Sequence, residues 1–291
     1  MLLFIITSFK LKSKKFKIKE MANVKKQSSS NGGNIFSVIA IIGCIIIGIL
    51  IWNFVMGHGS NFEGGNNANH PLPGNYLGMV YKGGKIVPIL MGLLLMVVVF
   101  SIERFMVISK AAGKGNLDQF MNNIQASVTN GDIEGAIAAC DKQQGSVANA
   151  IKAALIKYQE VKREGFDSES AAETIQKEIE EATSLEMPML EKNMTVLSTL
   201  VSLGTLAGLL GTVMGMITAF GALATTGTPD QAALANGISE ALINTATGIS
   251  TSALAIIAYN YFTSKIDTLT YSIDEAGATI IGTYRRFKGS L

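Results

Sequence analysis

Hydroxyl side chains recur at helical spacing in two apolar stretches of the sequence. Ser198, Thr205 and Thr212 are seven residues apart, so in a helix they lie on one face. In the later stretch one helical face holds a second set of small residues, Ala241, Thr245, Gly248 and Ser252. Hydroxyls in an apolar helix bond to a carbonyl one turn back, or they line a polar surface shared with another helix. The sequence leaves both interpretations open.

The residue types that the chain lacks limit the chemistry that it can perform. Both of its histidines, His58 and His70, lie in one Gly- and Asn-rich stretch, so no Ser-His-Asp set can form. No P-loop or dinucleotide-binding fingerprint is present. Cys44 and Cys140 are too few for a disulfide framework and are predicted to be free thiols. We therefore predict no enzymatic activity, no cofactor, and no catalytic or metal-ligating residue.

Ionisable residues are missing where the hydroxyls gather. No charged residue lies between Lys192 and Asp230, or between Glu240 and Lys265. A membrane protein that moves protons by itself usually carries a carboxylate or histidine relay. This chain offers hydroxyls, with Glu240 near one end. If it handles ions, another chain is expected to supply the titrating group.

The overall composition is that of a membrane protein. Of 291 residues, 48% are hydrophobic and 16% charged, with a mean hydropathy of +0.34. Soluble domains carry about 25% charged residues. This balance excludes disordered and collagen-like chains and argues against a soluble enzyme. Four stretches are apolar for the roughly 20 residues that a bilayer requires; they are residues 35–56, 86–109, 194–224 and 237–263.

These stretches are predicted to be helices, because the alternating pattern of barrel strands is absent. The later two are rich in small and hydroxyl residues and should be the inner helices of the bundle. Small residues four apart, Gly204 with Gly208 and Gly211 with Gly215, favour close helix packing there. The fold class is therefore all-α, a polytopic membrane helical bundle with four transmembrane helices and long cytoplasmic helical extensions.

The placement of Lys and Arg predicts the orientation. Residues 1–34 form a basic cytoplasmic tail with eight lysines, interpreted as disordered and close to anionic lipid rather than bound to nucleic acid. The first helix then leads outward. We expect loops 57–85 and 225–236 to be periplasmic, and segments 110–193 and 264–291 to be cytoplasmic. Both termini are thus predicted to be cytoplasmic.

The cytoplasmic segments are predicted to be helical. Residues 110–193 show apolar spacing of three and four, with breaks at Gly131 and Gly145. Asp167 should cap a helix that runs into the third span, with a kink and no end at Pro188. Residues 264–291 should prolong the fourth span. Loop 57–85, rich in Gly, Asn and Pro, should be irregular.

Three segments carry a family resemblance. GLLGTVMGMITAF (208–220) and SEALINTATGISTSALAIIAYN (239–260) resemble the MotA/TolQ/ExbB proton-channel family, closest to its ExbB/TolQ branch. GGKIVPILMGLLLMVVVFSIERF (83–105) resembles that family's first helix. The resemblance covers about residues 80–290, in the family's order. Its layout of one helix, a large cytoplasmic segment and two helices matches the topology above.

The resemblance implies an oligomeric ring, a homopentamer in the bacterial inner membrane. Its pore would hold single-span partners of the ExbD or TolR kind, whose Asp takes up the proton. Thr212, Thr245 and Glu240 match family motif positions, and the two threonines are expected to face the pore. The full set of expected ion-pathway residues is Thr205, Thr212, Glu240, Thr245, Thr247 and Ser252.

The function that the resemblance implies is a stator. Proton flow would drive a TonB-like transducer that acts on outer-membrane transport. The alternatives are a TolQ-like or gliding-type stator for work on the envelope, and a membrane scaffold that conducts no ions. This chain departs from the family at Leu254, where a proline is frequent, and in its extra first span, residues 35–56. That span is interpreted as a brace outside the ring or a partner-binding helix.

Overall fold

The chain was analysed as a computed structural model, which describes residues 31–226 and 231–289. Its contacts divide it into two units, residues 1–44 and 45–291. The described part of the first unit is helix. Helix α2 spans Asn31–Leu50 and passes from the first unit into the second. The loop residues 227–230, predicted to lie between the last two spans, fall outside the described residues, as does the basic tail up to residue 30.

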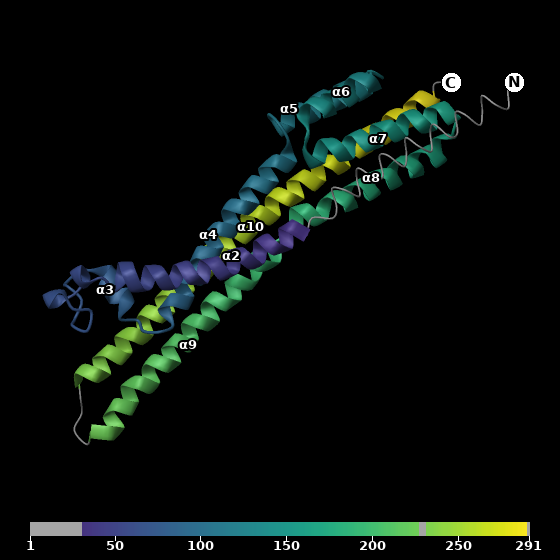
Figure 1. Ribbon diagram of the computed structural model, residues 1–291. Helices are drawn as coiled ribbons and strands as arrows, with labels where there is room; N and C mark the ends of the chain where they lie inside the picture. The colour runs from purple at the N-terminus through teal and green to yellow at the C-terminus, as the bar shows by residue number, and fades with distance from the viewer. Residues whose placement is uncertain (1–30, 227–230, 290–291) are drawn as a thin grey trace. The chain divides into compact units, whose positions relative to one another are not determined.

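The second unit is built from helices joined by short connections (Figure 1). The residues that the structure describes contain no strand, only an isolated bridge between Phe62 and Pro71. The helices are α3 (Tyr76–Tyr81), α4 (Val87–Ala112), α5 (Leu117–Thr129), α6 (Ile133–Gln143), α7 (Gly145–Glu164), α8 (Ser168–Glu191), α9 (Met194–Thr226) and α10 (Gln231–Gly289).

Four helical stretches are long and apolar enough to cross a membrane. They are Ile35–Met56, Val87–Thr129, Ser168–Gly221 and Gln231–Lys288. Each overlaps one of the four predicted spans. The predicted fold class, an all-α bundle with four membrane-spanning helices and long helical extensions, is confirmed.

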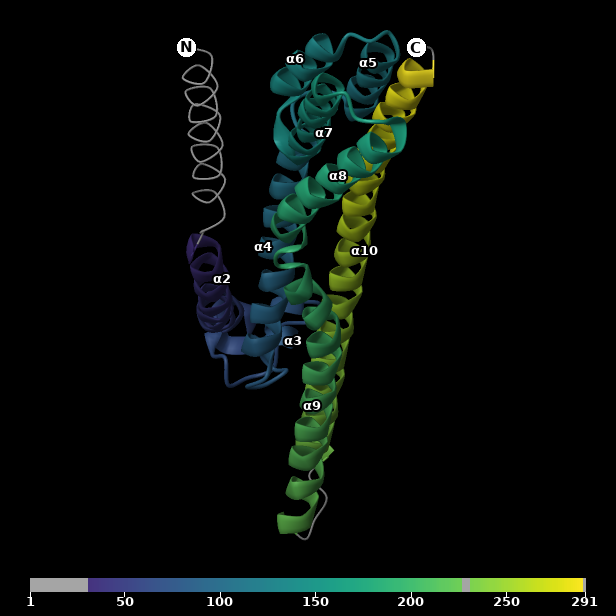
Figure 2. The same ribbon diagram turned by 90° about the vertical axis from the view of Figure 1, so that its right-hand side faces the viewer.

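Helix α10 is a single helix of 59 residues. At 1.5 Å per residue it is about 90 Å long, about three times the hydrocarbon thickness of a bilayer. Its first half packs against α9 and α4, and its second half packs against α5, α7 and α8 (Figure 2). The predicted continuation of the fourth span into the C-terminal segment is confirmed as far as Gly289.

The connection between the first two apolar stretches, residues 57–85, is more ordered than predicted. Two short 3₁₀ turns, Gly59–Asn61 and Glu63–Gly65, precede α3. Asn61 donates through Nδ2 to the carbonyls of Val55 and Met56, and so closes the end of the preceding π-helical turn, Ile51–Met56. The expectation of a wholly irregular loop is wrong, because side-chain amides satisfy backbone groups that the turn leaves free.

The helices of the segment predicted to be cytoplasmic have breaks and a cap where the sequence indicated. Gly131 and Gly145 have φ values of +78° and +88°, and they lie at the α5–α6 and α6–α7 junctions. Asp167 caps α8 by accepting from the backbone N–H groups of Glu169 and Ser170. These local signals work because each depends on one residue type and its immediate backbone.

The junction between α8 and α9 contradicts the prediction. Pro188 lies inside α8, and the helix ends three residues later at Glu191. Lys192 has a ψ of +138° and Asn193 a φ of +63°, so the chain turns before α9 begins. The break is held by Arg104 of α4. Its Nη1 donates to the carbonyls of Met189 and Leu190 at 3.2 and 3.1 Å.

Candidate functional site

Helices α9 and α10 approach each other along a line of glycines. A Cβ added to Gly208 would lie 3.0 Å from the Asn244 carbonyl oxygen, and one added to Gly215 would lie 2.8 Å from the Gly237 carbonyl oxygen. Gly248 faces α9 in the same way, because its Cβ would meet the Gly208 Cα at 2.7 Å. Both predicted glycine pairs therefore lie in this interface. Backbones can pack so closely only where side chains are absent.

Two pairs of hydroxyls bridge this interface. Thr205 Oγ1 donates to Ser252 Oγ at 2.8 Å. Thr212 and Thr245 share a hydrogen bond in which either hydroxyl can donate. The two pairs, called the hydroxyl rungs below, are seven residues apart on each helix, which places them about 10 Å apart along the axis. The seven-residue spacing on both helices thus brings the predicted stripes face to face.

The hydroxyls of the Thr212–Thr245 rung also lie close to backbone carbonyls of their own helices, which was the other interpretation of the hydroxyl pattern. Thr212 Oγ1 lies 3.2 Å from the Gly208 carbonyl oxygen, and Thr245 Oγ1 lies 3.2 Å from the Ala241 carbonyl oxygen, each one turn back. A hydroxyl has one hydrogen and two acceptor lone pairs, so it can bond within its helix and across to its neighbour. Both threonines are half-buried. The rung is therefore held at one edge of the interface rather than sealed inside it.

Two other hydroxyls, the stripe residue Ser198 and the expected ion-pathway residue Thr247, do not join the rungs. Ser198 Oγ donates to the Thr195 carbonyl oxygen at 3.1 Å, and Thr247 Oγ1 donates to the Ile243 carbonyl oxygen at 2.8 Å. Each bonds within its own helix. Thr247 is two residues from Thr245, which is more than half a helical turn, so the two cannot share a face. The structure brings together Thr205, Thr212, Thr245 and Ser252 of the predicted set.

Glu240 lies apart from the rungs, at the start of the α10 span. A Cβ on Gly84 would meet the Glu240 carboxyl carbon at 2.6 Å, so the carboxyl rests against the loop before α4. Gly84 has a φ of +84°, which glycine adopts without strain. The sequence placed Glu240 near the outer end of the bundle, and only the fold shows which helix it faces.

A buried ion pair fixes where α9 begins, and the sequence did not predict its role. Arg104 is 1% exposed and pairs with Glu103 of the same helix. Asn193 Nδ2 donates to Glu103 Oε2 at 3.3 Å. Arg104 thus links α4 to the last carbonyls of α8 and, through Glu103, to the turn before α9. Adjacent opposite charges were the only sequence signal, and they do not indicate a contact 85 residues away.

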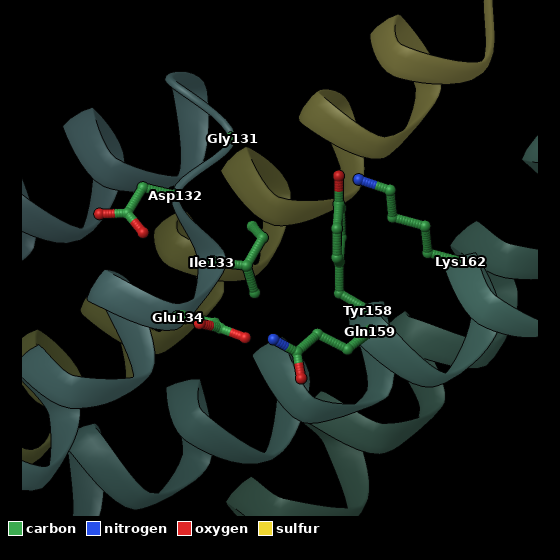
Figure 3. A pocket seen from close by; sticks show the side chains of 7 residues that line it. All are labelled: Gly131, Asp132, Ile133, Glu134, Tyr158, Gln159 and Lys162. Carbon is green, nitrogen blue, oxygen red and sulfur yellow. The ribbon is translucent and has the colours of Figure 1, made fainter.

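A polar pocket lies between the α5–α6 turn and α7 (Figure 3). The Lys162 ammonium lies 4.0 Å from the centroid of the Phe287 ring and 6.0 Å from that of Tyr158. Its charge is therefore engaged by aromatic rings. The lining residues are Gly131, Asp132, Ile133, Glu134, Tyr158, Gln159 and Lys162.

The described residues include no group of three or more His, Cys, Asp or Glu that could hold a metal ion. Both cysteines are free, as predicted. Burial is the main cause that raises the pKa of the Cys140 thiol to about 12, so this thiol stays protonated and packs as an apolar side chain.

Comparison with known proteins gives one family. Residues 143–275 match the profile of the MotA/TolQ/ExbB proton channel family. This range includes α7, α8, α9 and most of α10, and therefore contains both hydroxyl rungs.

The proteins of known name that are similar to this chain include TolQ and ExbB proteins. The chain is 29% identical over 159 residues to the Tol-Pal system protein TolQ of Pseudomonas aeruginosa, which covers 54% of this chain and 69% of that protein. It is 32% identical over 120 residues to the biopolymer transport protein ExbB of Xanthomonas campestris, which covers 39% of this chain and 47% of that protein. It is 33% identical over 85 residues to the biopolymer transport protein ExbB of Salmonella typhimurium, which covers 29% of this chain and 35% of that protein. The matches thus span less than half of these two ExbB proteins.

Proposed function

Because residues 143–275 match the profile of the MotA/TolQ/ExbB proton channel family, we propose that this chain is a member and the pore-forming subunit of a proton-driven stator in the bacterial inner membrane. The observation that carries this proposal is the pair of hydroxyl rungs between α9 and α10. They are polar groups held at fixed positions along two apolar helices. Hydroxyls of this kind can line a path for protons or ions.

The missing carboxylate identifies the kind of partner. The sequence has no Asp, Glu, His, Lys or Arg in residues 193–226 or 241–264, so the rungs alone offer no group that takes up a proton near neutral pH. A single-span partner of the ExbD or TolR kind would bring an Asp beside Thr212 and Thr245. A hydroxyl that donates to that carboxylate stabilises its ionised form and so sets when it accepts a proton.

The family resemblance further suggests the assembly. Five copies of α9 and α10 would enclose the partner helices, and α4 would form the outer layer. Both chain termini would be cytoplasmic. The additional span, residues 35–56, would brace the ring from outside or bind a partner.

The work that proton flow drives has two candidates. ExbB-type function would couple the stator to a TonB-like transducer and outer-membrane transport. TolQ-type function would couple it to envelope constriction. Relatives of both names match this chain, and the TolQ protein is matched over the larger share of its length. Both candidates require the same pore chemistry.

Proton uptake by liposomes tests the proposal. The full chain is reconstituted with its ExbD-like partner, and flux is measured under an imposed potential for wild type and Thr245→Val. A hydrogen bond to a charged group is worth about 1.5–3 kcal/mol, so we expect flux to fall by about tenfold or more. Thr218→Val is the matched control, because that exposed hydroxyl bonds only to the Met214 carbonyl of its own helix.

Native mass spectrometry of each sample establishes that both proteins are present. Partner-dependent flux that falls only in Thr245→Val supports the channel and the role of this rung. Equal flux in wild type and Thr245→Val contradicts the role of the rung. A complete assembly that carries no flux, even with its transducer added, favours the alternative of a membrane scaffold that conducts no ions.

A further inference from the structure

Asn244 is a polar side chain enclosed within the membrane-spanning part of α10. It is 0% exposed. Its Nδ2 donates to the Gly83 carbonyl oxygen, just before α4, at 2.8 Å. On the other side it lies against α9, where a Cβ on Gly211 would meet Asn244 Nδ2 at 2.8 Å. Asn244 therefore contacts both elements that pack on this part of α10.

The other end of the same carboxamide has no donor. Asn244 Oδ1 is buried, and no donor in the described part of the chain lies within hydrogen-bond distance of it. The Gly83 carbonyl can only accept, so the amide must turn its NH₂ group towards Gly83 and its oxygen away. An unpaired buried acceptor loses its bond to water without a replacement. A hydrogen-bond donor for Oδ1 is therefore expected in a functional state of the protein.

The described part of the chain offers few donors near this oxygen. Asn244 is enclosed by its own subunit, so a neighbouring subunit cannot reach the oxygen. One turn further along α10, Gly248 has no side chain, and the hydroxyls of Thr247 and Thr251 already donate to backbone carbonyls at 2.8 and 2.9 Å. One turn back is Glu240, and side chains four residues apart in a helix meet on one face.

Glu240 and Asn244 reach neighbouring residues of the same loop. The Glu240 carboxyl rests against Gly84, and the Asn244 amide donates to Gly83. No hydrogen bond from a described residue reaches the Glu240 carboxyl. An ionised carboxylate can only accept, as Asn244 Oδ1 does, so it would offer this oxygen no proton. A protonated carboxyl carries the O–H that Oδ1 lacks.

The charged groups around Glu240 are few. Helix α9 contributes none, since the sequence of residues 193–226 has no ionisable side chain. At the start of α4, Lys85 is exposed and the Lys82 ammonium donates to the Ala68 carbonyl oxygen at 3.0 Å. In α10 the next charged residue is Lys265, about seven turns away. No described cation pairs with the Glu240 carboxylate.

We propose that Asn244 positions a proton on Glu240, with the neutral carboxyl donating its O–H to Asn244 Oδ1. The carboxylate takes the proton from the outer aqueous side and releases it again as a proton, and no other bond changes. This site lies between α10 and the start of α4, whereas the Thr212–Thr245 rung lies between α9 and α10. Each subunit thus holds a proton of its own, besides the one on a partner's Asp. The inference rests on the proposed function only for the use made of that proton.

Infrared spectroscopy of the full chain in lipid, titrated with pH, tests this site. We expect a carbonyl band of a protonated carboxyl at neutral pH that is lost in Glu240→Gln. In Asn244→Ala the band should move to higher frequency or give way to a carboxylate band, because its hydrogen-bond acceptor is gone. Alanine fits this position, since it faces Gly211. Asn260→Ala, an exposed asparagine on the same helix, is the matched control and should leave the band unchanged.

Thermal unfolding provides an independent measurement. Glu240→Gln puts an N–H group permanently beside Asn244 Oδ1, so its midpoint should lose the fall with rising pH that wild type shows as Glu240 ionises. The proposal is wrong if no carboxyl band depends on Glu240 at any pH, or if the band is the same in Asn244→Ala. A chain that shows the band but conducts no protons contradicts the proposed function and leaves this site standing. A complex that conducts protons but shows no carboxyl band from Glu240 contradicts this site and leaves the proposed function standing.

Discussion

Helix α10 is packed in two different ways along its length. Beside α9 most of its buried residues are small, among them Gly237, Ala241, Gly248 and Ala255. In its second half large side chains join the small ones, with Tyr284 and Ile280 both fully buried. The change follows the solvent that the sequence predicts for each half. Lipid gives no hydrophobic reason for helices to associate, so the membrane half depends on close backbone contact, whereas the aqueous half buries apolar area.

The two halves should therefore fail differently when mutated. In the membrane half, an added side chain separates the helices and removes the rungs. In the aqueous half, a lost side chain leaves a cavity. Each prediction below changes one half and measures whether the other is affected.

Gly208→Leu should have the largest effect. Even a Cβ at this position would lie 3.0 Å from the Asn244 carbonyl oxygen and 3.1 Å from the Gly248 Cα. We expect loss of the assembled complex and of all proton flux, measured by native mass spectrometry and liposome uptake. Gly221→Leu is the control, because its Cβ would meet no atom within 4 Å. Retained assembly in Gly208→Leu would show that the α9–α10 contact is not essential.

Tyr284→Ala should destabilise the aqueous half by about 3–5 kcal/mol, the usual range for removing a large buried aromatic side chain. Tyr284 is 0% exposed, and its ring centroid lies 5.3 Å from that of Tyr158. Its hydroxyl donates to the Phe166 carbonyl oxygen at 3.2 Å. Chemical unfolding of the purified chain measures the change. Tyr271→Ala is the control, since that ring is 67% exposed on the same helix.

A comparable loss of unfolding free energy in Tyr284→Ala and Tyr271→Ala would contradict the conclusion that burial of Tyr284 stabilises the aqueous half. The membrane half should keep its helicity in Tyr284→Ala, because the rungs and glycine contacts lie elsewhere on α10. Circular dichroism at the unfolding midpoint separates the two halves.

Asp167 should give the smallest effect, and one that depends on pH. Hydrogen bonds from Ser170 and Glu169 lower the pKa of this N-cap carboxyl in the folded state. A lowered pKa stabilises the fold above the carboxyl's ordinary value, and the contribution disappears as pH falls through the folded-state pKa. Asp167→Ala should thus lower the thermal midpoint slightly at neutral pH and have no effect in strong acid. An equal shift at both pH values would rule out this charge effect.

The sequence predicted features that depend on spacing within one segment. The four spans, the caps and the glycine breaks are of this kind, and so is the seven-residue stripe that became the rungs. Each is governed by helical periodicity or by one residue's backbone preference.

Contacts between distant segments were beyond the sequence. Asn244 bonds to a carbonyl 161 residues away, and Arg104 to carbonyls 85 and 86 residues away. Neither partner has a side-chain signature, because the acceptors are backbone carbonyls. The end of α8 was misplaced for the same reason: Pro188 is the local breaker, while the actual break is held from α4.

The unbroken course of α10 has a mechanical consequence. A rod of 59 residues without an internal break rotates as one body. Over about 90 Å, a tilt of about 5° carries the far end about 8 Å sideways. Helix α9 offers no such lever, because the chain turns at Lys192–Asn193 before it begins. A small displacement at the first end of α10 is thus carried along this helix into α5, α7 and α8, which pack against its second half.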